Sequence, residues 1–146
     1  MDRTDLERLT DRYLTAMNRH DPRTLAALYA PDCRVDSPLF SSLLGIAAIE
    51  ESYKQWFTIF PDIEFTPEST IVDPPRVAVT TVNTATHEGE LFGLPATHKK
   101  VEFRSVRIVT VNEAGLIVAE RRIYDFTGLL VQLGVLRAKP AKPSNG

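Results

Sequence analysis

The sequence has a single cysteine, Cys33, so the chain cannot form an internal disulfide and no oxidising compartment is implied. It has little excess charge, because 17 lysine and arginine residues face 19 aspartate and glutamate residues. This balance argues against nucleic-acid binding through phosphate contacts and against a polybasic membrane anchor. The N-terminal MDRTDLERLT lacks the apolar core of a signal peptide, and no run approaches the ~20 apolar residues of a membrane span. We therefore expect a soluble cytoplasmic protein with neither a nucleic-acid nor a membrane partner.

Several catalytic motifs are also missing. The sequence has no GxGxxG or GxxxxGK[ST] loop to cradle a nucleotide, and no GxSxG nucleophile turn. Its three histidines, His20, His87 and His98, do not have the spacing of metal ligands. We expect no cofactor and no metal, which leaves chemistry by carboxylate, tyrosine, histidine and arginine side chains.

The length of the chain permits one hydrophobic core. With 146 residues, of which 43% are hydrophobic, about two-thirds of the extended surface can be buried on folding. The C-terminal segment 137–146, RAKPAKPSNG, is polar and rich in proline and lysine, so it is predicted to be a disordered tail. The remaining residues, 1–136, are predicted to form one domain.

The first half of the sequence has the pattern of helices. Thr4 and Glu7 fit a capping box. Apolar residues then follow at helical spacing: Leu6, Leu9, Tyr13 and Met17. Residues 21–22, Asp-Pro, end this helix and begin a second one. A third amphipathic helix is predicted over 46–60, where Pro61 ends it.

Between the second and third helices, a short strand is predicted over 33–36 and a loop over 37–45. From residue 63 onward, the apolar residues alternate with the period of two that is typical of strands. Further strands are predicted over 63–72, 76–92, 99–111 and 116–124, and a short helix over 127–136. Helices followed by antiparallel strands indicate an α+β fold, with helices packed on one face of a curved sheet. The concavity between the two layers is the expected binding site.

Two segments resemble a known family. Residues 86–97, THEGELFGLPAT, and residues 124–134, YDFTGLLVQLG, resemble signature sequences of the SnoaL-like polyketide cyclases, in which Phe60-Pro61-Asp62 also recurs. The resemblance implies the nuclear-transport-factor-2-like fold, a cone-shaped pocket between helices and sheet, and a homodimer. It also implies ring closure of polyketides without a cofactor.

The resemblance assigns Asp125 as the acid/base, because family members use a carboxylate at the end of the last strand. If strand alternation is regular, Arg121 shares the face of Asp125 and could hold an enolate or carboxylate oxygen. The alternative for Asp125 is an N-cap of the following helix. The alternative for Arg121 is a salt bridge on the surface or at a dimer interface.

The segment 12–38 is similar to ketosteroid isomerase. Tyr13 falls on the oxyanion-hole tyrosine of that enzyme, and Ser37 falls on its catalytic aspartate, with Asp36 one residue earlier. Arg107 stands where the isomerase has its protonated aspartate. The loss of both acids argues against steroid isomerase activity, but the alignment makes Arg107, Ser37 and Asp36 candidates for substrate binding. Each of Tyr13 and Arg107 has a structural alternative, as a core tyrosine and as a solvated strand arginine.

Three further candidates come from position in the pattern. His87 lies within the first signature segment and is a candidate proton carrier, or else a structural histidine. Trp56 and Phe60 are candidates for the pocket wall or for the core, and helical spacing does not separate the two.

Together these observations predict a cofactor-independent cyclase, acting on a polyketide-like or other apolar, carbonyl-bearing small molecule in natural-product biosynthesis. The catalytic candidates are Asp125, Tyr13, Arg121 and His87. Ring closure could also proceed mainly by holding the substrate in a reactive fold. Alternatives of the same fold are an isomerase, a dehydratase, an epoxide hydrolase or a non-catalytic module that binds a small ligand. A sheet that is apolar on both faces, for example at Val77, Ala78, Val79 and Val82, favours the homodimer.

Overall fold

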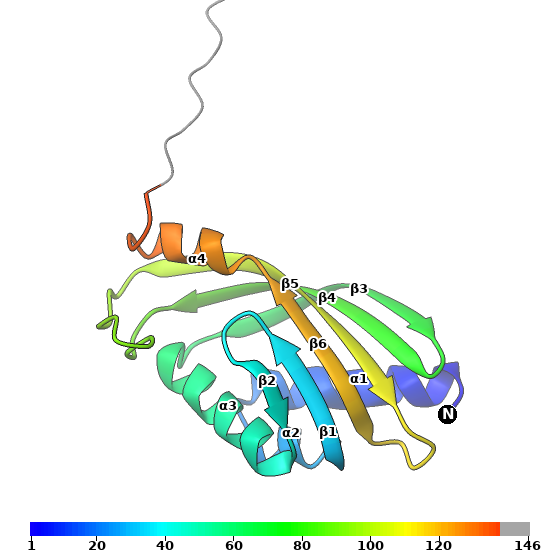
Figure 1. Cartoon of the computed structure of the whole chain (residues 1–146). Coiled ribbons are helices and arrows are strands. Elements are labelled where there is room, and N and C mark those ends of the chain that lie inside the picture. Colours follow the sequence, from blue (N-terminus) through cyan, green and yellow to red (C-terminus); the bar gives the residue numbers. More distant parts are fainter. Residues whose placement is uncertain (138–146) are drawn as a thin grey trace, which may run out of the picture.

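A curved, open sheet of six strands with four helices forms the fold, as seen in the computed structural model, which describes residues 1–137 (Figure 1). The elements along the chain are α1 (Arg3–Asn18), α2 (Pro22–Ala26), β1 (Tyr29–Ser37), β2 (Ser41–Leu44), α3 (Ile46–Ile59), β3 (Glu64–Asp73), β4 (Arg76–Thr86), β5 (Lys100–Val111), β6 (Ile117–Tyr124) and α4 (Phe126–Gln132). The predicted α+β class is confirmed. Of the predicted tail, 137–146, all residues after Arg137 lie outside the described residues.

The strands are ordered β2-β1-β6-β5-β4-β3. Strand β1 runs parallel to β6, and every other neighbouring pair is antiparallel. Helices α1 and α3 pack on the inner, concave face of the sheet, and α4 follows β6 and contacts β5 (Figure 1). The core and any internal cavity therefore lie between the sheet and the pair α1 and α3. Within residues 1–137, no helix is long and apolar enough to cross a lipid bilayer.

The helices begin at acidic caps. Helix α1 is capped by Asp2, whose carboxylate accepts from the Asp5 amide at 2.9 Å, while the Asp5 carboxylate accepts from the Asp2 amide at 3.1 Å. The predicted capping box at Thr4 and Glu7 is therefore wrong, because the helix begins two residues earlier. Asp21 caps α2 as predicted, accepting from the Thr24 amide at 3.1 Å.

Two strand predictions need correction. The strand predicted over 76–92 ends at Thr86, because residues 87–99 leave the sheet and turn toward α3. There the amides of Glu88 and Gly89 both donate to the carbonyl of Ile59, at 3.0 and 3.1 Å. The loop predicted over 37–45 contains the edge strand β2, which pairs with β1.

A register shift in the last hairpin decides which residues of β6 face inward. Thr110 of β5 pairs with Ala119, but the next residue, Val111, pairs with Ile117, so Val118 is an extra residue in β6. Both Ile117 and Glu120 are consequently buried, although they are three positions apart. Beyond this bulge the even-numbered residues of β6 face the interior and the odd-numbered residues face outward.

Candidate functional site

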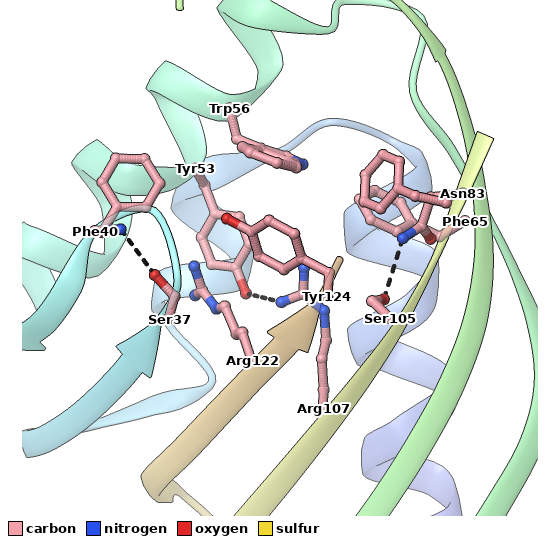
Figure 2. Close-up of a pocket in the computed structure, with 11 residues that line it drawn as sticks. Ser37, Phe40, Tyr53, Trp56, Phe65, Asn83, Ser105, Arg107, Arg122 and Tyr124 are labelled. Carbon is pink, nitrogen blue, oxygen red and sulfur yellow. Dashed lines mark hydrogen bonds between the residues drawn. The ribbon is translucent and has the colours of Figure 1, made fainter. Parts of the chain in front are cut away.

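A narrow cavity lies between α3 and the inner face of the sheet (Figure 2). Its wall is aromatic on the helix side and polar on the strand side. The lining residues are Ser37, Phe40, Tyr53, Trp56, Phe65, Asn83, Phe103, Ser105, Arg107, Arg122 and Tyr124. The volume is about 20 Å³, which is about what one water molecule needs. A larger ligand therefore enters only when wall side chains move, and Phe40 and Tyr124 are both half-buried.

The carboxylate of Glu120 is the centre of a buried polar network behind this cavity. Arg122 Nε donates to Glu120 Oε2 at 2.7 Å, and the hydroxyl of Tyr29 donates to the same oxygen at 2.9 Å. The hydroxyl of Tyr13 donates to Glu120 Oε1. Each carboxylate oxygen therefore has a strong donor, which buried carboxylates require.

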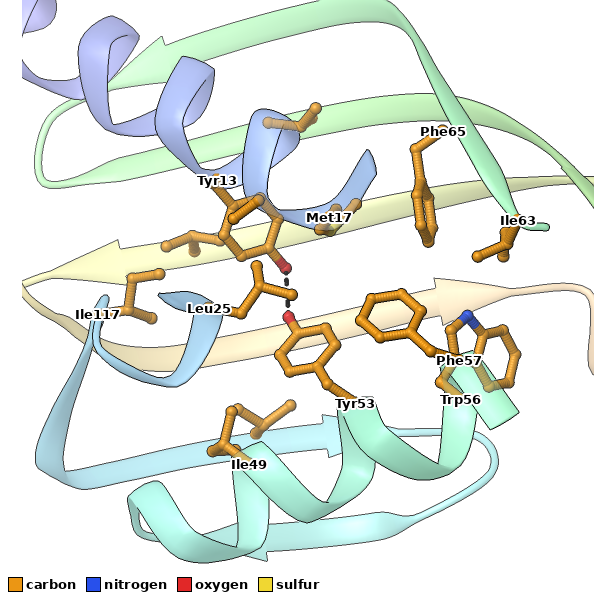
Figure 3. Packing of buried hydrophobic residues seen from close by; sticks show 14 of the residues in the cluster. Tyr13, Met17, Leu25, Ile49, Tyr53, Trp56, Phe57, Ile63, Phe65 and Ile117 are labelled. Carbon is orange, nitrogen blue, oxygen red and sulfur yellow. Dashed lines mark hydrogen bonds between the residues drawn. The ribbon is translucent and has the colours of Figure 1, made fainter. Parts of the chain in front are cut away.

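Tyr53 connects this network to the cavity. Its hydroxyl lies 3.0 Å from the hydroxyl of Tyr13 and 2.9 Å from that of Tyr29; Figure 3 shows the contact with Tyr13. Arg107 Nη1 donates to the Tyr13 hydroxyl at 2.7 Å and to the Tyr53 hydroxyl at 3.4 Å. Only Tyr53 and the two arginines of this network line the cavity, whereas Tyr13, Tyr29 and Glu120 lie behind them.

The three tyrosine hydroxyls have fewer protons than the network has oxygen–oxygen contacts. Tyr13 and Tyr29 each donate a single proton to Glu120, so Tyr53 can donate its own proton to only one of these two tyrosines. The Tyr53 proton can therefore occupy two alternative positions. Such a ring can pass a proton between the cavity and Glu120 by a series of short transfers.

The charges of the network are fixed by their neighbours. Burial by itself would raise the pKa of Glu120, but the charges of Arg122 and Arg107 outweigh it, and the pKa lies below its ordinary value. Burial raises the pKa of Tyr13 and of Tyr29 well above the ordinary phenol value. Burial would lower the pKa values of Arg107 and Arg122, but the surrounding tyrosines and Glu120 raise both. The carboxylate and both guanidiniums are therefore ionised at neutral pH.

A second polar group lies on the sheet side of the cavity. The hydroxyl of Thr81 donates to Asn83 Oδ1 at 2.7 Å, and Asn83 Nδ2 donates to the Ser105 hydroxyl at 3.1 Å. The Ser105 hydroxyl lies 2.8 Å from that of Thr81. Because the Thr81 proton is already used, Ser105 donates in this contact and the three side chains form a closed ring. One amide N–H of Asn83 is left over beside the cavity.

The structure distributes the residues predicted from sequence over three environments. Arg107, Ser37 and Trp56 line the cavity, and Tyr13 lies directly behind it. Phe60 is fully buried against Trp56 and His87, with ring centroids 5.2 and 5.9 Å away, and does not line the cavity. The roles predicted for these residues stay predictions.

Asp125, Arg121 and Asp36 lie on the outside of the sheet or beyond its end. Asp125 is exposed and caps α4, accepting from the Gly128 amide at 2.8 Å, which is the alternative considered from sequence. Arg121 is exposed because the bulge in β6 turns it outward. Asp36 accepts from Ser42 at 2.6 Å and from Arg34 at 3.3 Å, and these contacts, the first most strongly, lower its pKa. None of these three residues lines the cavity.

His87 is buried at the point where β4 ends. Its Nδ1 accepts from the Thr97 amide at 3.1 Å and lies 2.9 Å from the Thr97 hydroxyl. This bonding closes the loop 87–99, which agrees with the structural alternative for His87. The contact also assigns the ring proton of the neutral histidine to Nε2.

Sequence reasoning missed Glu120, Arg122, Tyr53, Asn83 and Ser105. In the sequence, Glu120 and Arg122 belong to the run AERRIY, where the apolar Ile123 indicates the opposite face of the strand. Tyr53 lies on the apolar stripe of the third predicted helix, and helical spacing indicates no role for its hydroxyl. The spacing of Asn83 and Ser105, each at an inward position of its strand, is the one signal that could have found the polar ring.

Comparisons with known proteins agree with this architecture. The chain superposes on AclR, a proposed hydroxylase from Streptomyces galilaeus, with a TM-score of 0.83, 25% identity and coverage of 95% of this chain and 91% of AclR. It also superposes on IdmH, a proposed polyketide cyclase from Streptomyces antibioticus. The TM-score is 0.74 and the identity 25%, with coverage of 88% of this chain and 98% of IdmH. A proposed SnoaL-like polyketide cyclase from Jannaschia shares the fold, with a TM-score of 0.84, 19% identity and coverage of 94% and 99%.

The class is therefore the α+β fold called ketosteroid-isomerase-like, which a solved structure from Catenulispora acidiphila shares with this chain at a TM-score of 0.75 and 13% identity. Residues 7–133 match the family model of the SnoaL-like polyketide cyclases, so the chain belongs to this family, as the signature segments predicted. At the level of the family, its function is associated with polyketides. No curated protein matches the sequence significantly.

Proposed function

We propose that this protein closes a carbon ring in a polyketide-like substrate without a cofactor, with Tyr53 as the proton donor in the cavity. The observation that carries the proposal is the position of the Tyr53 hydroxyl. It lies on the cavity wall, 3.4 Å from the guanidinium of Arg107 and in hydrogen-bond contact with Tyr13 and Tyr29.

This arrangement fits the needs of an intramolecular aldol addition. An enolate carbon of the substrate attacks a carbonyl carbon of the same molecule, a carbon–carbon bond forms, and the carbonyl oxygen becomes an alkoxide. Tyr53 can donate a proton to that oxygen. The positive charges of Arg107 and Arg122 stabilise the negative charge that develops on the oxygen before this transfer. Positioned donors of this kind contribute about 10²–10³-fold in rate. The aromatic walls of Trp56 and Phe103 favour a folded substrate conformation and so supply proximity.

The base of the reaction is the second requirement. None of the described residues that line the cavity is an aspartate, a glutamate or a histidine. Glu120 lies behind Tyr53, and the hydroxyls of Tyr13 and Tyr29 connect the two. A proton taken from the substrate could therefore pass through the tyrosine ring to Glu120, with no direct contact between Glu120 and the substrate.

The test uses a bicyclic aryl β-keto ester with a neighbouring ketone, a molecule that can close a third ring by aldol addition. The proposal predicts a product of the same mass as the substrate, or lighter by one water after dehydration, formed in the absence of oxygen and of added cofactor. Ring closure no faster than in buffer, across a series of such esters, would contradict it.

Hydroxylation is the second candidate, favoured by the 25% identity to AclR. It predicts a product heavier by one oxygen atom and consumption of one dioxygen, whose second oxygen atom leaves as water with two electrons from a reductant such as NADPH added to the incubation. Mass spectrometry of the same incubation, with and without oxygen, separates the two functions.

We further propose that two copies of the chain pair through the outer face of the sheet. This face exposes Ile71 on β3 and Ile123 on β6, which are 63% and 45% exposed. Half-buried Ala78, Val82 and Ile108 lie on the same face. An apolar sheet face of this kind is more stable when covered.

A further inference from the structure

The buried charges around the cavity do not balance. Arg107 and Arg122 are both buried, and Glu120 is the one buried carboxylate among residues 1–137. Glu120 is hydrogen-bonded to Arg122 at 2.7 Å and lies 4.0 Å from the nearest nitrogen of Arg107. One carboxylate cannot neutralise two guanidiniums, so the cavity wall keeps an excess positive charge.

Aromatic rings compensate this charge only in part. The guanidinium carbon of Arg122 lies 4.5 Å from the centre of the Tyr53 ring, and that of Arg107 lies 5.7 Å from the rings of Tyr13 and Phe65. Such contacts stabilise a cation, but they supply no negative charge. A buried charge without a counter-charge is costly, which favours any ligand that brings one.

The hydrogen bonds of the wall show the same bias toward donors. Among the described residues, Arg122 Nη2 and Trp56 Nε1 are buried nitrogens without a hydrogen-bond partner, and both side chains line the cavity. The spare amide N–H of Asn83 is a third donor. Figure 2 shows these side chains around one space, with Trp56 on α3, Arg122 on β6 and Asn83 on β4. Nitrogen donors need acceptors, and an oxyanion offers several lone pairs.

We propose that the cavity takes its substrate as an anion, a mainly flat, apolar molecule that carries a delocalised oxyanion, with an oxygen of that group bound to Arg122 Nη2. The chemistry is shared by a carboxylate and by the ionised enol of a β-dicarbonyl group. The inference rests on the proposed function, since it concerns the same cavity. An ionised enol would enter with its reacting carbon already nucleophilic, which explains how a wall without a carboxylate could serve ring closure.

Binding of matched probes tests the inference without turnover. The first pair is 2-hydroxy-1,4-naphthoquinone, an acidic enol that is ionised at neutral pH, and the neutral 1,4-naphthoquinone. The second pair is 2-naphthoate and the neutral 2-naphthamide. Calorimetry gives each Kd. Trp56 is the single tryptophan of the chain, so its fluorescence reports whether the probe occupies this cavity.

We expect the anion of at least one pair to bind ten times more tightly than its neutral partner, about 1.4 kcal/mol. Preference in the first pair alone identifies an enol site, and preference in the second pair alone identifies a carboxylate site. Equal affinities, or tighter binding of the neutral probes, would overturn the inference.

Arg107→Met tests whether the excess positive charge causes the preference for anions. It removes that charge and leaves the pair of Arg122 and Glu120 intact. We expect the anion preference to fall at least fivefold. Arg121→Met is the matched control: it removes the same charge from the exposed outer face, and the preference should stay as in the wild type. If Arg107→Met does not fold, as judged by circular dichroism, Asn83→Asp makes the same change of charge with a side chain of nearly the same shape.

Failure of this inference and failure of the proposed function give different results. A protein that closes the ring of the β-keto ester but binds charged and neutral probes equally keeps its function and refutes the anion site. A protein that prefers anions but forms no cyclic product keeps the anion site and loses the proposed reaction.

Discussion

The carboxylate of Asp125 accepts a hydrogen bond from the backbone amide of Gly128 at 2.8 Å, across the first turn of α4. A Cβ atom at Gly128 would lie 2.1 Å from Asp125 Oδ2, so any larger residue at this position would displace the capping carboxylate. Farther along the same signature segment, Gln132 exchanges two hydrogen bonds of 2.9 Å with the backbone of Glu102 on β5. Through these contacts, the C-terminal signature segment caps α4 and holds it against β5.

Substitutions at Asp125 should show how much its N-cap stabilises the fold. Asp125→Asn should leave the free energy of unfolding within about 0.5 kcal/mol of wild type, because asparagine is an equally good N-cap, whereas Asp125→Ala should lose about 1 kcal/mol. Urea denaturation of the three proteins measures both values. Equal stability of the alanine variant and the wild type would show that the cap contributes nothing.

The first signature segment also has a structural role. The hydroxyl of Thr86 donates to Asp62 at 2.6 Å, and a Cβ atom at Gly89 would lie 2.2 Å from the Thr58 carbonyl oxygen at the end of α3. The segment thus fixes the loop 87–99 against α3.

Gly89→Ala should therefore lower stability by about 1–3 kcal/mol, as overpacking does. Thermal unfolding checks this value, with Thr84→Ala, at an exposed position of β4, as the control that should change little. An unchanged melting temperature in Gly89→Ala would mean that the loop can move away from α3 at no cost.

Glu120 should make stability depend on pH. Its pKa is lower in the folded protein than the ordinary value of 4.5, so its ionised form favours folding. That stabilisation is fully present above the ordinary value and is lost as the pH falls through the lower, folded value. Glu120→Gln, which leaves two buried guanidiniums without a carboxylate, should cost about 3–5 kcal/mol at neutral pH.

The difference in unfolding free energy between wild type and Glu120→Gln should shrink as the solution is made acidic. Urea denaturation over a pH series measures it. A difference that stays constant at acidic pH would contradict the ionised state assigned to Glu120.

The proposed dimer predicts a mass of two chains in light scattering at micromolar concentration. Ile123→Glu, on the outer face of β6, should give a monomer that keeps the fold, because this side chain is 45% exposed and is not part of the core. A monomeric wild type, or a variant that stays dimeric, would exclude this face as the interface.

The helices were predictable from the sequence, whereas the inward face of β6 was not. Helical spacing in α1 and the Asp-Pro pair before α2 were enough to place those elements, because caps and periodicity act locally. The inward face of β6 was not predictable, because the bulge at Val118 reverses the alternation and depends on pairing with β5. With that reversal, Glu120 and Arg122 replace Arg121 and Asp125 at the interior. The partners that make a buried charged pair acceptable come from α1, β1 and α3, far away in the sequence.

The most direct test of the account is a comparison of Tyr53→Phe and Asp125→Asn in the ring closure of the β-keto ester. Tyr53→Phe keeps the ring packed beside Arg122 and removes one hydroxyl, so turnover should fall about 10²–10³-fold. Asp125→Asn should keep more than about a third of the wild-type rate, a change in barrier below ~1 kcal/mol. The opposite result, a slow Asp125→Asn and an unaffected Tyr53→Phe, would contradict the assignment of the site to the cavity.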